Sequence, residues 1–387
     1  MNRRNFLSLT GTFTGGMLLV PDFLHALGSS NSLITGNECV VFIQLNGGND
    51  GLNTFIPFQD DTYYYSRPKI AITKDEVLNM GKGMGFHPDL KDLARIMQEG
   101  NLSVIQNVGY PEPNRSHFRS QEIWQTASSS NEYLTDGWLG RYLDMHFHEH
   151  NPVGAVNLDT IDNLALKGKQ PNATTVREPN RYKTNSKVSD GKLSDNPQLD
   201  FVRKIANSVS EGSEEIQKAL VKSAKTTTYP KTKLGRNLEW IAQLIKGDLN
   251  TSVYYTSQNG YDTHDNQLPT QKRNFTELND AVSALYDDLK KTGKLASTTI
   301  VIFSEFGRRV KDNGSGTDHG TAAPMFIIGG SNKGQIIGEN PDLLNLDEGD
   351  LKYKIDFRSV YATLLQNKLG FNPYQIGIKE KTINNLF

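Results

Sequence analysis

The amino-acid sequence predicts an α/β fold with a largely parallel central sheet and helices on both faces. Short apolar runs rich in β-branched residues recur along the chain, as in strands that are covered on both faces. Amphipathic helical patterns separate most of these runs, as the crossovers of βαβ units require. The apolar runs occupy residues 39–45, 102–108, 252–256, 299–303 and 325–328.

Helical periodicity supports the same class. Residues 88–100 lie between the first two apolar runs and carry an apolar face, which forms a βαβ unit with them. Other helices are predicted at residues 234–245 and 356–369. The clearest stripe, directly before the run at 299–303, consists of Phe275, Leu278, Val282, Leu285 and Leu289.

Composition excludes several functions. The chain has 387 residues, a length that large α/β enzymes reach as one elaborated domain. With 42 basic and 43 acidic residues its net charge is −1, so no charge excess draws it to nucleic acid or to a membrane surface. Cys39 is the single cysteine, which rules out internal disulfides and a cysteine-based zinc cage.

The first 28 residues are typical of an export signal. Arg3 and Arg4 precede a mildly apolar, glycine-containing stretch that ends in small residues, the pattern of a twin-arginine signal. The apolar part is too short to span a hydrocarbon layer, which needs ~20 residues. An ordinary amphipathic helix is the alternative. We expect a mature domain over residues 38–387 with a polar insertion at about 167–233.

Two loops that follow predicted strands carry candidate site residues. Asp50 lies in NGGNDG, where paired glycines permit positive φ and close backbone approach, although an Asp-Gly turn would look the same. Ser116 lies at a predicted helix start, where backbone N–H groups favour an anionic oxygen; a plain serine N-cap is the alternative. Arg115 and His117 flank it.

Acidic and histidine side chains gather after the later strands. Asp262 and His264 share one loop, a density that suits a metal site, with a chance acidic turn as the alternative. Glu305 follows the run at 299–303, and His319 precedes the run at 325–328. Sites of open α/β sheets form at the carboxyl ends of strands. The run of His146, His148 and His150 is better explained as a solvated helix end.

The ordered motifs NGGNDGLNTFIP, PNRSHF, GYDTHDNQ, SEFGR and DHG, after the paired arginines, resemble the exported family called domain of unknown function 1501. The resemblance covers essentially the whole mature chain. It implies membership of the alkaline phosphatase and sulfatase superfamily, hence an alkaline phosphatase-like sheet with a metal site along its carboxyl edge.

Carried over by position, the resemblance implies that Ser116 is the nucleophile. It implies that Arg115 or Arg308 holds substrate oxygens, although either could be a surface arginine. The implied metal ligands are Asp50, Asp262, His264, Glu305 and His319. Zinc is the first expectation, as one or two ions, with magnesium, manganese and calcium as alternatives. Glu305-Phe306 stands where an Asp-His step is usual, so a single-metal site is also open.

The resulting expectation is an exported, periplasmic or cell-surface, metal-dependent hydrolase of small anionic phosphate or sulfate esters. The alternative is a non-catalytic binding or secretion-associated protein that keeps the fold and at most a structural ion. A companion exported protein is a candidate partner. Nucleic acid is not expected, and membrane contact is expected only through the signal segment.

Overall fold

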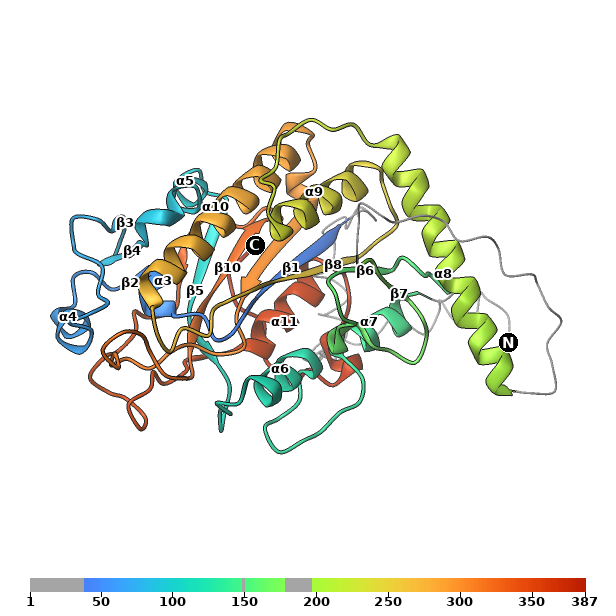
Figure 1. Ribbon diagram of the computed structural model, residues 1–387. Coiled ribbons are helices and arrows are strands. Elements are labelled where there is room, and N and C mark those ends of the chain that lie inside the picture. Colours follow the sequence, from blue (N-terminus) through green and yellow to red (C-terminus); the bar gives the residue numbers. More distant parts are fainter. Residues whose placement is uncertain (1–37, 148–149, 178–196) are drawn as a thin grey trace, which may run out of the picture. The chain divides into compact units, whose positions relative to one another are not determined.

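The computed structural model describes residues 38–147, 150–177 and 197–387. Its centre is a sheet of nine strands in the order β11-β5-β10-β9-β1-β8-β6-β7, with β12 also paired to β5 (Figure 1). The strands are β1 (Cys39–Asn46), β5 (Leu102–Gly109), β6 (Ala155–Leu158), β7 (Ala173–Thr175), β8 (Val253–Asn259), β9 (Thr298–Phe303), β10 (Ala323–Gly329), β11 (Ile336–Ile337) and β12 (Ile355–Asp356).

The sheet is largely parallel, as the sequence predicts. β1 pairs in parallel with β8 on one side and β9 on the other. β10 is the exception, because it runs antiparallel to both β9 and β5. The loop that joins β9 to β10 contains no helix. A parallel strand would need a crossover connection, usually a helix. The chain instead turns back at the carboxyl end of β9 and forms β10 antiparallel to it.

Helices cover both faces, which confirms the predicted α/β class (Figure 1). Val41, Ile43 and Leu45 of β1 belong to a core shared with α5 (Lys91–Gln98), α9 (Lys233–Lys246) and α10 (Gln267–Lys291). Val40 and Phe42 belong to a second core with α6 (His117–Thr126), α7 (Trp138–His146) and α11 (Phe357–Asn367). Alternate residues of a strand point to opposite faces, so one buried strand serves both cores.

Two features differ from the sequence-based expectation. A small second sheet has the strand order β2 (Phe55–Ile56), β4 (Met84–Phe86), β3 (Leu78–Gly81). The short helix α3 (Gly51–Thr54) precedes β2, and the short helix α4 (Asp61–Ser66) lies between β2 and β3 in the chain. A long helix, α8 (Pro197–Lys222), runs through the expected polar insertion. Gly212 lies inside α8, but a single glycine destabilises a helix by only about 1 kcal/mol and does not end it.

The expected insertion at 167–233 contains β7 and α8, and near its end α8 contributes Ile216 and Ala219 to the core beside α9. Residues 178–196 lie outside the described part of the chain, as do residues 1–37 with Arg3 and Arg4. The export signal therefore stays a prediction. Within the described ranges, none of the helices has the length and apolarity needed to cross a membrane.

Candidate metal centre

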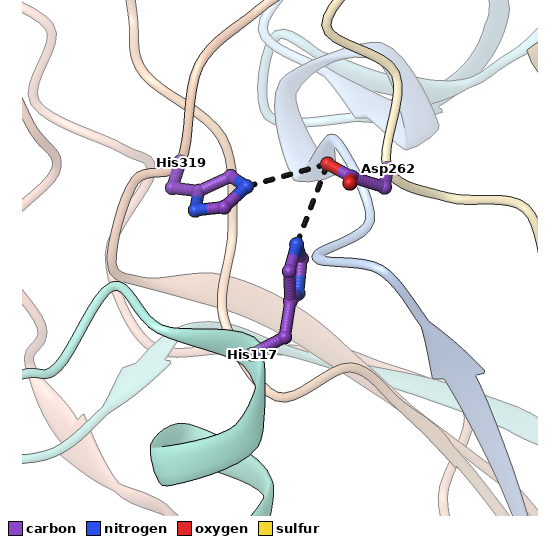
Figure 2. Close-up of side chains that lie close together, drawn as sticks. All are labelled: His117, Asp262 and His319. Atoms are coloured by element: carbon purple, nitrogen blue, oxygen red, sulfur yellow. Dashed lines mark hydrogen bonds and ion pairs between the residues drawn. The ribbon is translucent and has the colours of Figure 1, made fainter.

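Histidine and aspartate side chains from three separate segments meet at the carboxyl edge of the sheet. His117 is the first residue of α6, which follows β5. Asp262 lies in the loop after β8, and His319 lies in the loop that leads from β9 into β10. Figure 2 shows both imidazoles directed at the Asp262 carboxylate. In the described part of the chain, these three residues form a group that could hold a metal ion.

The ligand atoms of this group are close together. The Oδ1 atom of Asp262 is 3.4 Å from Nε2 of His117 and 3.3 Å from Nε2 of His319. All three candidate ligand atoms lie within 4.8 Å of one another. Nε2 of His117 is buried and makes no hydrogen bond within the described chain. A buried ring nitrogen that makes no hydrogen bond and faces a carboxylate and a second imidazole fits the binding of a divalent cation.

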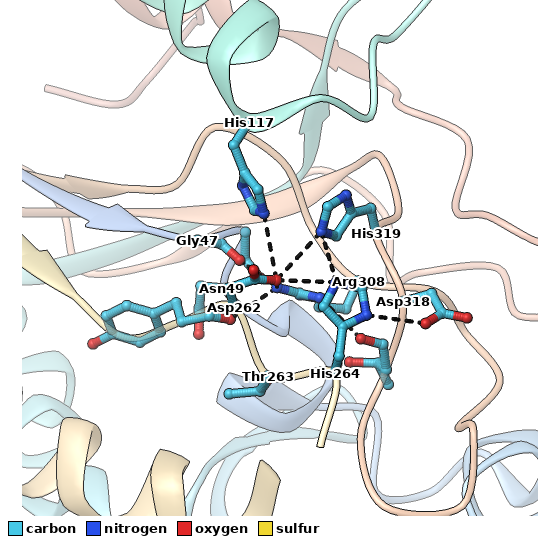
Figure 3. Close-up of polar contacts among 12 residues, drawn as sticks. Gly47, Asn49, His117, Asp262, Thr263, His264, Arg308, Asp318 and His319 are labelled. Carbon is cyan, nitrogen blue, oxygen red and sulfur yellow. Dashed lines mark hydrogen bonds and ion pairs between the residues drawn. The ribbon is translucent and has the colours of Figure 1, made fainter. Parts of the chain in front are cut away.

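A third imidazole completes the cluster (Figure 3). Nε2 of His264 lies 3.1 Å from Asp262 Oδ1 and 2.8 Å from Nε2 of His319. Two imidazole nitrogens at this separation need either a proton or a cation between them. His264 is therefore a further candidate metal ligand beside the group of three.

Each of the three histidines has its second ring nitrogen held by an acceptor. Nδ1 of His117 is 2.9 Å from Oε1 of Glu305, and Nδ1 of His264 is 3.1 Å from Oδ1 of Asp318. Nδ1 of His319 is 2.7 Å from the carbonyl oxygen of Arg115. An acceptor at Nδ1 favours the tautomer that leaves the Nε2 lone pair available. Metal-binding histidines are held in this way by outer carboxylates or carbonyls.

The charges of the cluster suit a cation. Burial alone would raise the pKa of Asp262, but the hydrogen bond and charge of Arg308 outweigh it, and the pKa falls to about 2. Burial lowers the pKa of His319, helped by the nearby His117 and Arg308. At neutral pH this arrangement therefore offers an ionised carboxylate and a neutral imidazole, the forms that bind metal.

Glu305 was expected as a direct ligand, and the structure places it behind His117 instead. Its side chain is fully buried, and Oε1 accepts hydrogen bonds from the Gly47 N–H at 2.9 Å and from His117. Ser304 Oγ donates to Oε2 at 3.0 Å. Burial would raise the pKa of Glu305, but the hydrogen bonds from His117 and Gly47 lower it. The His117–Glu305 hydrogen bond in turn raises the pKa of His117.

Asp50 is also held away from the group of three. Oδ2 of Asp50 lies 2.5 Å from Nη1 of Arg67 and accepts a 2.6 Å hydrogen bond from Nε2 of Gln267; the Asp50 and Arg67 side chains are both fully buried. The remaining oxygen, Oδ1, accepts from the backbone N–H of Leu52 at the start of α3. In this structure Asp50 forms a buried ion pair with Arg67 and caps helix α3.

The glycines before Asp50 have the backbone role that the sequence suggests. Gly47 has a φ of +119°, and a Cβ atom there would lie 2.3 Å from the backbone nitrogen of Asp262. Only glycine fits both the conformation and the contact. The loop after β1 can therefore approach the loop that carries Asp262 and supply the N–H that Glu305 accepts.

Ser116 is the N-cap residue of α6, but its side chain makes no capping hydrogen bond. The residue is exposed, and its two neighbours both take part in the cluster: the Arg115 carbonyl holds His319, and His117 is a candidate ligand. The plain N-cap alternative therefore does not describe the Ser116 hydroxyl. It lies free at the edge of the metal centre and at the N-terminus of a ten-residue helix.

The two candidate substrate-binding arginines are both engaged by the protein. Arg308 is buried and donates to the carbonyl oxygens of Gly48 and Thr317 at 2.7 and 2.9 Å and to Asp262 Oδ1 at 2.6 Å. Arg115 forms ion pairs with the fully buried Asp350 and with Glu348. Arg308 thus joins the loops of the centre, and Arg115 ties α6 to the segment before β12.

His117 flanks Ser116 in the sequence, but it is not among the metal ligands that the family resemblance implies. The signal was its place at a helix start directly after a core strand, which is where the sheet brings ligands together. Of the His146–His150 run, His146 ends α7 with its ring 5.0 Å from that of Tyr142 and is not part of the group of three, while His148 lies outside the described residues.

Fold and site together define an α/β protein with a candidate His/Asp metal centre at the carboxyl edge of a mostly parallel sheet. The model of the family "Protein of unknown function (DUF1501)" matches residues 101–379, and the chain belongs to this family. No curated protein sequence matches the chain.

Several solved structures align with most of the chain at low identity. The lipoteichoic acid synthase LtaP from Listeria monocytogenes is 9% identical over 95% of this chain and 78% of its own, with a TM-score of 0.43. The PsFucS1 sulfatase from Pseudoalteromonas sp. is 10% identical over 91% and 72%, with a TM-score of 0.44. A protein of the alkaline phosphatase superfamily from Vibrio parahaemolyticus is 11% identical over 90% and 72%, with a TM-score of 0.43.

Proposed function

We propose that this protein is an exported, metal-dependent hydrolase that acts on phosphate or sulfate esters. One observation carries the proposal: the imidazoles of His117, His264 and His319 all present Nε2 toward the Asp262 carboxylate, and each is held at Nδ1 by an acceptor. Such preorganisation is expected where a cation must be bound in one arrangement.

His117, Asp262 and His319 would hold the ion, with His264 beside them. A set of imidazole nitrogens and one carboxylate favours zinc, with other divalent ions as alternatives. A divalent cation at this place would act as a Lewis acid toward a phosphoryl or sulfuryl oxygen. Glu305, Asp318 and the Arg115 carbonyl fix the orientation of the imidazoles.

Ser116 is the proposed nucleophile. Its hydroxyl is exposed, makes no capping hydrogen bond, and lies between two residues that take part in the cluster. The first N–H groups of α6 have no side-chain cap and can receive the oxygens of a tetrahedral anion. A serine hydroxyl is a weak nucleophile unless it is activated, so the neighbouring cluster is part of the proposal.

One observation favours a second candidate, a non-catalytic binding or secretion-associated protein with at most a structural ion. Both arginines expected to hold substrate oxygens are committed to protein partners, Arg308 to carbonyl groups and Asp262, and Arg115 to Asp350 and Glu348. An enzyme acting on anionic esters generally keeps a free cation for its substrate.

The proposed cellular setting rests on the sequence. The paired arginines support export by the twin-arginine route to the periplasm or cell surface, and the balanced charge argues against nucleic acid as a partner. A companion exported protein is proposed as a partner of the non-catalytic form.

The test uses the exported full-length product, stripped with a chelator and reloaded with zinc. Metal content is measured by mass spectrometry and turnover with 4-nitrophenyl phosphate and 4-nitrophenyl sulfate. Near-stoichiometric zinc with turnover of either ester supports the hydrolase. Zinc without turnover supports the non-catalytic protein, and the absence of both contradicts a metal centre at this edge of the sheet.

A further inference from the structure

A pocket of about 340 Å³ lies next to the candidate metal centre. Its volume falls in the range of small-molecule sites. The walls come from the end of β5 with the loop after it, from α6, and from the segment before β12. The apolar part of the lining consists of Tyr110, Trp124, Leu351 and Tyr353.

Three of the lining segments also carry residues of the centre. Glu305 lines the pocket and accepts from Nδ1 of His117. Thr321 lines it and follows closely after His319, and Pro113 lines it shortly before Ser116. The pocket therefore borders the place where the ester would be cleaved.

The chemistry of the lining selects an organic group and not a second anion. Glu112, Glu305, Asp347 and Lys352 are the charged lining residues, so the pocket carries more negative than positive charge. Lys352 is engaged with Oδ1 of Asn345 at 2.7 Å. An anionic phosphate or sulfate is thus disfavoured here, while the aromatic side chains offer contact area for a flat apolar ring.

Trp124 forms part of the aromatic wall of the pocket. The indole is 3% exposed and stacks on Phe303 and Phe357, with ring centroids 5.3 and 4.4 Å apart. Its Nε1 atom is buried and has no hydrogen-bond partner within the described chain. Because Nε1 has almost no exposed surface, Trp124 contributes its aromatic ring to the pocket and not its N–H.

We infer that this pocket binds the organic part of the ester, and that this part is an uncharged aromatic ring. The inference rests on the proposed function for the cleavage step, but binding of the ring itself needs neither metal nor turnover. The ring contacts Tyr353 and Leu351, which line the pocket. The anionic group of the same molecule lies at the metal centre.

The binding test uses 2-naphthol as the probe and isothermal titration calorimetry on the full-length, chelator-treated protein. Tyr353→Ala removes a half-exposed wall and should weaken 2-naphthol binding about fivefold, the effect of losing one aromatic contact. Tyr374→Ala is the matched control, because Tyr374 is an exposed tyrosine that does not line the pocket. Thermal unfolding checks that each variant is folded.

The turnover test compares the zinc-loaded variants on 2-naphthyl phosphate and methyl phosphate. Tyr353→Ala should lower the ratio of the two kcat/KM values about fivefold, and Tyr374→Ala should leave it unchanged. Binding of 2-naphthol that depends on Tyr353 in a protein without turnover would support the pocket and contradict the hydrolase. Turnover without 2-naphthol binding, or with a selectivity that Tyr353→Ala does not change, would overturn the pocket and leave the hydrolase in place.

Discussion

His117 stands between two carboxylates: its Nδ1 lies 2.9 Å from Oε1 of the buried Glu305, and its Nε2 lies 3.4 Å from Oδ1 of the half-exposed Asp262. The inner carboxylate, Glu305, holds the His117 ring in its orientation. The outer carboxylate, Asp262, lies beside Nε2, the His117 nitrogen that is a candidate metal ligand. This relationship distinguishes two acidic residues that look equivalent in the sequence: Glu305 positions the His117 ring, and Asp262 is a candidate ligand.

Glu305→Gln should lower zinc affinity about 10- to 100-fold, because the substitution keeps the shape but removes the charge that holds His117. Competition with a chromophoric chelator measures the affinity. Glu339→Gln is the control, since Glu339 is exposed and outside the cluster. A loss as complete as that of a first ligand would show that Glu305 binds the ion directly.

His117→Ala and His319→Ala should each abolish stoichiometric zinc binding, because each removes one of the three donors that lie within 4.8 Å of one another. Metal analysis after gel filtration gives the result, and circular dichroism confirms folding. His150→Ala, at an exposed histidine of the other histidine run, should retain full zinc. If all three variants bind as much zinc as the unchanged chain, His117 and His319 are not metal ligands.

Ser116→Ala should retain zinc and lose most turnover, because the hydroxyl acts in the reaction and the imidazoles with Asp262 supply the binding energy. Zinc content and kcat are measured on the same preparation with 4-nitrophenyl phosphate. Full activity of this variant would leave Ser116 as an ordinary residue at the start of α6 and would exclude it as the nucleophile.

Asp50→Ala should lower the free energy of unfolding by about 3 kcal/mol, because it leaves the buried Arg67 guanidinium without its carboxylate partner. Zinc affinity of the folded variant should not change. Urea denaturation and zinc titration separate the two effects. Asp61→Ala is the matched control, since Asp61 pairs with Lys74 on the surface and should have little effect on stability. Loss of zinc without loss of stability would restore Asp50 as a ligand.

Stability of the metal-free protein should fall in acid through His87. Burial lowers the pKa of this imidazole from 6.5 to about 4. The stability that the neutral His87 side chain contributes is complete above pH 6.5 and is lost as the pH falls toward 4. In that interval only the unfolded chain takes up the proton, which favours unfolding. At pH 5 the loss is about 2 kcal/mol.

His87→Asn is the comparison for this effect, because an asparagine can keep the acceptor that Nδ1 of His87 offers to the Asp89 N–H. Urea unfolding at pH 7.5 and pH 5 should show a smaller decrease for the variant than for the unchanged chain. Parallel decreases in both proteins would show that His87 does not titrate as described.

The sequence by itself determined the fold class and the order of its main elements. The apolar runs became β1, β5, β8, β9 and β10, and the stripe from Phe275 to Leu289 became the buried face of α10. These predictions succeed because side-chain periodicity is local information: burial on both faces of a strand, or on one face of a helix, shows in consecutive residues. The sequence also pointed to Asp262 and His319, because each lies in a loop beside a predicted strand.

Only the tertiary structure decided which side chain does what. Asp50 and Asp262 both follow strands, but Asp50 pairs with the buried Arg67, 17 residues later in the chain, while Asp262 faces three imidazoles. His117 became a candidate ligand and Glu305 its support because α6 starts above the end of β9. The roles depend on contacts between residues far apart in the chain, and no local pattern encodes which of several acidic groups will meet the cation and which will meet an arginine.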